Sequence, residues 1–190
     1  MKPGPETLEL LLEGNRRYVE DRRKSPNQSA NRRLELTKGQ SPHSIVLGCS
    51  DSRVPPEIIF DQGLGDLFVI RVAGNVVDDI VLGSIEYAAE HLGSSLLMVL
   101  GHSDCGAVKA AMDDTELDGH LPSIAEAIEE AVRKQGFDAE LNVVVKTHAI
   151  ITAEHLMESE PVLASLVDEG KLFMVAGYYD FESGLVEVLR

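Results

Sequence analysis

Cysteine, tryptophan and long apolar runs are the scarcest features of this sequence. Its 190 residues include two cysteines and no tryptophan, which excludes a disulfide-rich secreted fold. No run approaches the roughly 18 apolar residues of a membrane span, and residues 1–20 lack the apolar stretch of a signal peptide. We therefore expect a soluble, cytoplasmic protein. Thiols stay reduced in that compartment, which favours a metal-binding or catalytic role for both cysteines.

Positive charge is also scarce, with 17 lysines and arginines against 32 aspartates and glutamates and a net charge of −15. This balance argues against a nucleic acid or an anionic membrane as partner, because lysine and arginine are what bind phosphate groups. Eight of the 17 basic residues lie between Arg16 and Lys38. This segment is either a solvated helix face or an arm that packs on an acidic partner subunit.

The chain does have a 44% apolar content, arranged in runs that alternate with helical patterns. Short apolar runs predict buried strands over 44–48, 66–71 and 96–101. Helical patterns occupy the stretches 6–20, 81–91, 107–112 and 123–134. Near-continuous apolar strands that alternate with helices are typical of a parallel sheet covered on both faces.

The C-terminal part of the chain is less regular. The three adjacent β-branched residues 143–145 favour a strand, but the apolar residues around them recur at helical spacing. We therefore predict a helix over 139–157. Two closing strands are predicted over 172–179 and 185–189, joined into a hairpin by a turn.

These elements predict a single domain over residues 1–190, of the α/β class. Its centre is a mostly parallel sheet with helices on both faces. An N-terminal helical arm spans 1–43, and an α/β core spans 44–190 and ends in the closing strands. The sequence shows no internal repeat and no low-complexity linker that would divide it further.

The two cysteines lie in the clusters C-S-D-S-R (49–53) and H-S-D-C (102–105), each directly after a predicted strand. The carboxyl ends of parallel strands meet at one edge of a sheet, where ligands gather. Two thiolates and one imidazole, from Cys49, His102 and Cys105, suit zinc better than magnesium or calcium, which prefer oxygen. Three protein ligands leave the fourth position of zinc to water, which indicates a catalytic site.

Other interpretations of these residues remain open at this point. The cysteines could be small buried hydrophobic residues, or part of a closed structural zinc site with Asp51 as the fourth ligand. Asp51 could instead accept a hydrogen bond from water on the metal, with Arg53 holding the carboxylate away from the ion by a bidentate pair. The third possibility for Asp51 and Arg53 is an ordinary ion pair within a loop.

Three blocks of the sequence resemble the signature blocks of the β-class carbonic anhydrases: C-S-D-S-R-V (49–54), R-V-A-G-N (71–75) and G-H-S-D-C-G (101–106). The resemblance extends from about Leu8 to the C-terminus. It implies a zinc lyase that reversibly hydrates carbon dioxide to bicarbonate and a proton, with one zinc ion in each chain. It also implies a homodimer or higher homo-oligomer, with the substrate pocket at the interface between subunits.

The resemblance also implies roles for single residues at the metal. Cys49, His102 and Cys105 would be the zinc ligands, and Asp51 with Arg53 would be the catalytic pair. The carboxylate would orient the nucleophile, and the guanidinium would hold the carboxylate off the metal.

A small substrate pocket is implied in the same way. Gln40 and the backbone N–H of Gly106 would hydrogen-bond the substrate, while Phe68, Ala73 and Tyr87 would form an apolar wall. Val46 stands where the allosterically inhibited members of the family carry a tryptophan. We therefore predict that their regulatory bicarbonate site is absent.

Two rival functions are kept beside this one. The same zinc site could hydrolyse carbon disulfide or carbonyl sulfide. Alternatively, the chain could be a non-catalytic, zinc-stabilised assembly protein. The second rival is disfavoured because a purely structural role needs none of Asp51, Arg53 and Gln40.

Overall fold

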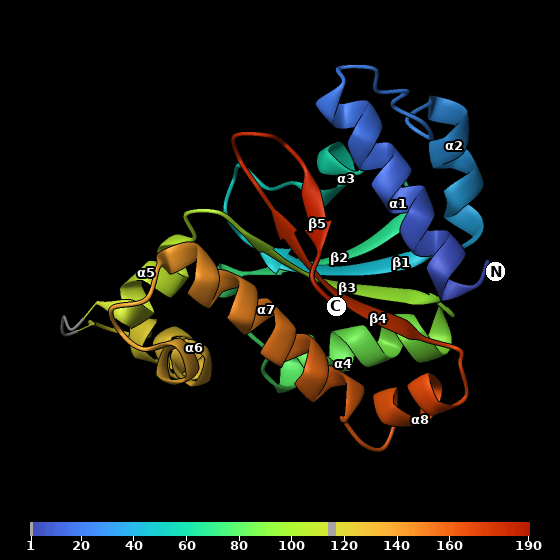
Figure 1. Ribbon diagram of the computed structural model, residues 1–190. Coiled ribbons are helices and arrows are strands. Elements are labelled where there is room, and N and C mark those ends of the chain that lie inside the picture. The colour runs from blue at the N-terminus through green and yellow to red at the C-terminus, as the bar shows by residue number, and fades with distance from the viewer. Residues whose placement is uncertain (1, 114–116) are drawn as a thin grey trace.

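The computed structural model describes residues 2–113 and 117–190. Its centre is a five-stranded sheet with the strand order β2-β1-β3-β4-β5 (Figure 1). The first four strands in this order run parallel, and β5 pairs antiparallel with β4. The strands are β1 (Ser44–Cys49), β2 (Leu67–Val72), β3 (Leu96–His102), β4 (Phe173–Tyr179) and β5 (Val186–Val188). The predicted fold class and all five predicted strands are confirmed.

Helices cover both faces of this sheet, with α1 and α3 on one side and α4, α7 and α8 on the other (Figure 1). The helices are α1 (Gly4–Val19), α2 (Ala30–Glu35), α3 (Pro56–Ile59), α4 (Asp79–Glu86), α5 (Gly106–Met112), α6 (Leu121–Gln135), α7 (Leu141–Met157) and α8 (Leu163–Asp168). A π-helical turn, Tyr87–His91, continues α4. Within the described residues, no helix has the length and apolar character needed to cross a lipid bilayer.

Most of the predicted helices are confirmed, including the helix over 139–157, which is α7. The β-branched run at its start therefore does not form a strand, because the helix buries Val144 and Val145 on its side facing β3 and β4 and leaves Val143 exposed. The short helices α2, α3 and α8 were not predicted from the sequence.

Alternate residues of the central strands pack into two apolar layers. Leu47 and Val99 face α4 and α7 on one side of the sheet. Val46 and Met98 face the opposite side, where Leu11 of α1 packs. Both β1 and β3 are buried along their whole length, which is why they appear in the sequence as continuous apolar runs.

A third apolar cluster surrounds the carboxyl ends of β1 and β3. It contains Cys49 and Cys105 together with side chains from α5, α6 and α7. The two strands are neighbours with Gly48 opposite Leu100, so both end at the same edge of the sheet. The parallel register thereby brings the two sequence clusters together.

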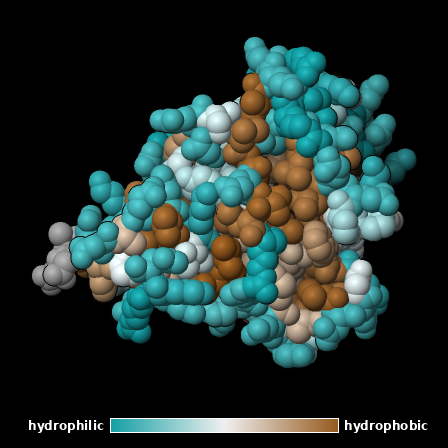
Figure 2. Space-filling view, in the orientation of Figure 1, coloured by the Kyte–Doolittle hydropathy of each residue, from teal (hydrophilic) through white to brown (hydrophobic). Residues whose placement is uncertain are grey.

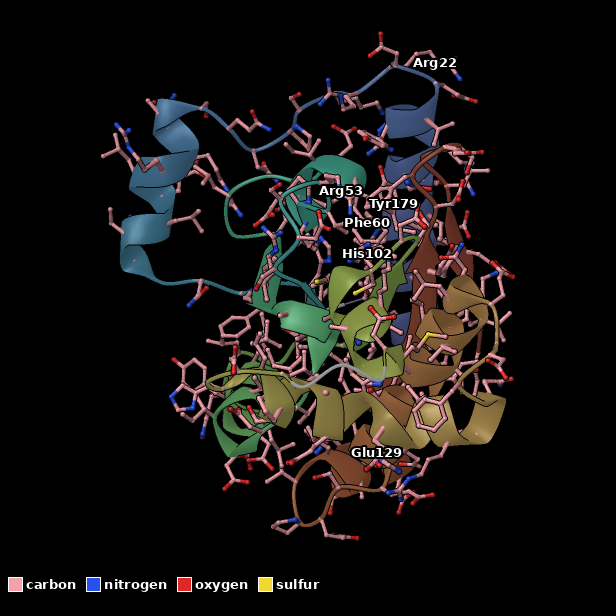
Figure 3. All side chains as sticks on the ribbon, turned by 90° about the vertical axis from the view of Figure 1, so that its left-hand side faces the viewer. Arg22, Arg53, Phe60, His102, Glu129 and Tyr179 are labelled. Atoms are coloured by element: carbon pink, nitrogen blue, oxygen red, sulfur yellow. The ribbon has the colours of Figure 1, made fainter. Side chains whose placement is uncertain are left out.

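The N-terminal segment has two parts that differ in their packing. Buried Asn15 ties α1 to the core: its amide nitrogen donates to the carbonyls of Ile59 (3.3 Å) and Gly184 (2.9 Å), and its oxygen accepts from the N–H of Val186 (2.9 Å). In contrast, α2 buries none of its residues, and Leu34 on this helix is 62% exposed. Figure 3 shows α2 standing off from the rest of the chain.

Candidate metal centre

Three side chains from two strand ends form a compact group of donor atoms. Cys49 is the last residue of β1, His102 is the last residue of β3, and Cys105 directly precedes α5. One donor atom from each lies within 4.8 Å of the other two, and all three residues are buried. Both cysteines are free thiols. The structure therefore brings together the three side chains that the sequence singles out as ligands.

The ring of His102 is oriented for metal binding. Its Nδ1 lies 2.8 Å from the carbonyl oxygen of Ser103, and because a carbonyl can only accept, Nδ1 carries the proton. Nε2 then has a free lone pair. This buried atom has no hydrogen-bond partner among the described residues, an arrangement that is costly unless the atom binds something. A metal ion at the donor group would satisfy it, so the residues present fit a metal.

The pKa values of the two thiols are shifted in opposite directions. The hydrogen bond between them lowers the pKa of Cys49 and raises the pKa of Cys105, and burial raises the pKa of Cys105 further. The N–H of Gly74, 3.3 Å from Sγ of Cys49, also helps to lower the pKa of Cys49. The chain thus prepares one thiolate by itself. A divalent cation would supply the charge that keeps the second sulfur deprotonated as well.

Asp51 and Arg53 form the bidentate pair that was one of the open interpretations. Nε of Arg53 donates to Oδ1 at 2.9 Å, and a terminal guanidinium nitrogen donates to Oδ2 at 2.7 Å. The side-chain hydrogen bonds from Arg53, together with its backbone N–H, lower the pKa of Asp51 to about 2, so the carboxylate is ionised at neutral pH. Asp51 is not one of the three clustered donors.

Arg71, on β2, is a residue whose role the sequence did not indicate. Its Nε donates to the backbone carbonyl of Cys49 at 3.0 Å, and a terminal nitrogen donates to the carbonyl of Asp51 at 2.5 Å. Arg71 thus fixes the backbone that carries one ligand and the carboxylate. Its place in the block 71–75 was the only signal that could have drawn attention to it.

Phe181, in the turn after β4, packs against both Arg53 and His102. Its ring centre lies 4.1 Å from the guanidinium carbon of Arg53 and 5.2 Å from the ring centre of His102. Its backbone N–H donates to the hydroxyl of Ser103 at 2.9 Å. Figure 3 shows Arg53 and His102 close together at this edge. Nothing in the sequence connects Phe181 with the two clusters, because the contact depends on the fold.

Two of the predicted pocket residues lie beside the donor cluster. Ala73 begins the turn after β2, and Gly106 begins α5 directly after Cys105. Both line an apolar hollow of about 250 Å³, whose remaining walls come from α5, α6 and Leu117. Gly106 directly follows Cys105 in the sequence, and Ala73 precedes Gly74, whose N–H donates to Sγ of Cys49.

The other three predicted pocket residues do not reach the same chain's cluster. Gln40 is exposed and precedes β1, whereas the ligand Cys49 ends it. Phe68 lies four residues before Val72, the β2 partner of Cys49, which places it about 13 Å away along the strand. Tyr87 packs against Phe68, with ring centres 6.3 Å apart. All three lie toward the amino end of the strands.

Comparisons with known proteins agree with this geometry. A family profile described as carbonic anhydrase matches residues 44–186. Carbonic anhydrase 2 of Mycobacterium tuberculosis is 41% identical over 181 residues, covering 92% of this chain and 87% of that protein. A tetrameric β-carbonic anhydrase of the ascomycete Sordaria macrospora superposes with a TM-score of 0.77 at 27% identity, covering 82% of this chain and 84% of the other. A Coccomyxa β-carbonic anhydrase in complex with acetazolamide also superposes with a TM-score of 0.77. It is 26% identical, and the match covers 96% of this chain and 86% of the other.

The fold and the donor cluster define an α/β protein with three side chains positioned for metal binding at one sheet edge. With the profile match and the relatives above, the chain belongs to the carbonic anhydrases, and within them to the β class. The resemblance noted in the sequence is confirmed.

Proposed function

We propose that the chain catalyses the reversible hydration of carbon dioxide to bicarbonate and a proton, at one zinc ion held by Cys49, His102 and Cys105. The observation that carries this proposal is a buried donor cluster beside an ionised carboxylate that does not belong to it. The family and the names of the relatives support the same activity. Two sulfurs and one imidazole nitrogen are a donor set that zinc prefers.

Each group at the site has a role in this reaction. When bound by three protein ligands, zinc supplies a water whose pKa falls from about 15.7 toward about 7. Asp51 can orient this nucleophile, because its ionised oxygens only accept hydrogen bonds, while Arg53 holds the carboxylate in place. The hollow beside Ala73 can hold an uncharged linear molecule, and the N–H of Gly106 can donate to its oxygen as charge develops there.

We infer that a second copy of the chain completes the substrate pocket with its own Gln40, Phe68 and Tyr87. Gln40 is exposed, and Tyr87 is 49% exposed, so both are free to contact a neighbour. Every residue of the edge strand β2 is only half-buried. The exposed helix α2 fits an arm that packs on a partner, and the Sordaria relative is tetrameric. The division into an arm over 1–43 and a zinc-binding core over 44–190 belongs to this proposal.

The surface also carries an apolar area that suits contact between copies. Figure 2 shows apolar residues gathered between α1 and the helices α7 and α8, with a hydrophilic rim around them. Exposed large apolar residues on the two C-terminal strands include Phe173 (38%) and Val188 (37%). Apolar patches rimmed by polar residues are typical of protein–protein contacts. We assign this one to a homo-oligomer.

The proposal is tested by stopped-flow measurement of carbon dioxide hydration on protein whose metal content has been determined. We expect one zinc ion for each chain and full loss of both zinc and activity in Cys49→Ser. The matched control is Ser50→Ala, at the exposed neighbouring position, which should retain both. Zinc-loaded protein without hydration activity would favour the assembly protein. Hydrolysis of carbonyl sulfide or carbon disulfide without hydration would identify the rival enzyme.

A further inference from the structure

One buried histidine outside the donor cluster has no part in the chemistry above. His148 lies in the middle of α7 and is 4% exposed. Its Nε2 lies 2.9 Å from the carbonyl oxygen of Gly74. A carbonyl only accepts, so Nε2 carries the proton and donates it to this bond. Burial lowers the pKa of His148, which agrees with a neutral ring that has one protonated nitrogen.

Gly74 connects this histidine with the metal ligands. Its carbonyl accepts from His148, and its own N–H donates to Sγ of Cys49 at 3.3 Å. Gly74 has a φ of +69°, a conformation that glycine adopts without a steric penalty, and an added Cβ would lie 2.9 Å from Cδ1 of Ile128. Both backbone polar groups of this one residue are therefore used, one toward α7 and one toward the sulfur.

The helix that carries His148 is held firmly beside the metal ligands. At Gly101, next to His102, an added Cβ would lie only 3.0 Å from Cγ1 of Val145, so α7 packs directly on the backbone of β3. Near the start of α7, Asn142 accepts a hydrogen bond from the N–H of Asp104 at 3.1 Å. Helix α7 thus contacts the loop between His102 and Cys105. Through His148 it also contacts the turn at Gly74, which faces Cys49.

We propose that His148 is a positioning residue of the metal centre, which acts through Gly74 to aim an N–H group at the thiolate of Cys49. The inference rests on the proposed function in one respect, that Cys49 binds the metal. A hydrogen bond to a thiolate withdraws charge from the sulfur, so it changes the metal–sulfur bond itself as well as its direction. Bracing of the fold alone would not have this electronic effect.

The test uses the full chain loaded with cobalt(II) or with an NMR-active cadmium isotope in place of zinc. In the wild type, the Gly74 amide proton should show scalar coupling to cadmium through the sulfur of Cys49. His148→Leu removes the donor, so we expect this coupling to be lost and the sulfur-to-cobalt charge-transfer band to move to longer wavelength. His148→Gln keeps an N–H donor near the position of Nε2 and should restore both signals. His155→Leu, at an exposed position of the same helix, should leave both unchanged.

Unchanged coupling and an unchanged band in His148→Leu would overturn the role of His148 while leaving the proposed function intact. If that variant fails to fold, His148→Asn replaces it, since the shorter amide cannot reach Gly74. Wild-type signals in both His148→Asn and His148→Gln would then overturn the inference. Failure of the wild type to bind either metal would instead overturn the metal centre itself.

Discussion

In the proposed reaction the Asp51–Arg53 pair serves catalysis and not metal binding, because Asp51 lies outside the donor cluster. We expect Asp51→Ala to lower kcat/KM for hydration by about 100-fold or more, the usual range for loss of a group that orients a proton. Zinc content should stay at one ion for each chain, since Asp51 is not a clustered donor. Stopped-flow kinetics and metal analysis provide the two measurements.

The matched control for this variant is Glu129→Ala. Glu129 also pairs with an arginine, at 2.6 Å, but on the exposed surface of α6, far from His102 in Figure 3. It should keep wild-type kinetics. Full activity in Asp51→Ala would show that the carboxylate has no catalytic role.

The same pair predicts a pH dependence of stability. The folded-state pKa of Asp51 is about 2, below its ordinary value of 3.8. A lowered pKa stabilises the folded state above the ordinary value, and this stabilisation is lost as the pH falls through the folded value. The ion pair of Asp51 and Arg53 should therefore add to the free energy of unfolding above about pH 4. This stabilisation should be lost between about pH 4 and pH 2.

Thermal unfolding of the wild type and of Arg53→Gln at several pH values checks this. The wild type should have the higher Tm at neutral pH, and the difference should shrink as the pH falls below about 4. A difference that stays constant down to the acid limit would mean that Arg53 stabilises the fold by packing on Phe181 and not by pairing with Asp51.

Residues at the site divide into those that sequence could identify and those that it could not. Cys49, His102 and Cys105 were identifiable because their chemistry is distinctive and each follows an apolar strand. Arg71 and Phe181 were not, because an arginine on a strand and a phenylalanine in a turn acquire their roles only from neighbours that lie far away in the sequence.

Among the elements, α1 is joined to the core in part through the hydrogen bonds of one buried polar side chain, Asn15. Asn15 bonds three backbone groups, from the segments at Ile59 and Gly184 and from β5 at Val186. Asn15→Ala would leave these buried groups without partners, at about 1–3 kcal/mol for each that water cannot reach. We expect the free energy of unfolding to fall by about 2–4 kcal/mol in denaturant titrations, with zinc content unchanged.

Glu13→Ala is the comparison on the same helix. Glu13 is exposed, so its removal should change the free energy of unfolding by less than about 0.5 kcal/mol. Equal stabilities for both variants would mean that the hydrogen bonds of Asn15 add nothing to the apolar and polar contacts that α1 makes elsewhere.

The elements that sequence predicted are those with a repeated apolar pattern. The strands are buried on both faces, and long helices such as α6 and α7 each present a broad apolar surface to the core. The six residues of α2, four of α3 and six of α8 are too short to show a period. Local contacts stabilise them, such as the hydroxyl of Ser29, which accepts from the N–H of Arg32 at the start of α2.

At the scale of the whole molecule, an interface that shares its pocket predicts complementation. If each site combines Asp51 of one copy with Gln40 of the other, a hybrid of Asp51→Ala and Gln40→Ala chains has one site with both defects and one with neither. Random pairing makes half of the dimers hybrids, so co-expressed chains should recover about one quarter of wild-type activity. Activity equal to the mean of the two separate variants would mean that both residues act within one chain.

Sequence alone could not say where Gln40, Phe68 and Tyr87 would act. Their roles were inferred from the family resemblance. Within a single copy of the chain, most of the length of a strand separates them from the donor cluster. Residue order along a chain carries no information on which copy supplies a side chain.

The confinement of both cysteines to the donor cluster has a practical consequence. The sequence contains no cysteine besides these two, so every thiol in it is a candidate metal ligand. In a loaded native chain a bound metal would protect both thiols from an alkylating reagent, whereas a stripped chain would react first at Cys49, whose pKa is lowered. The mass added per molecule would therefore count empty sites directly, without any correction for bystander cysteines.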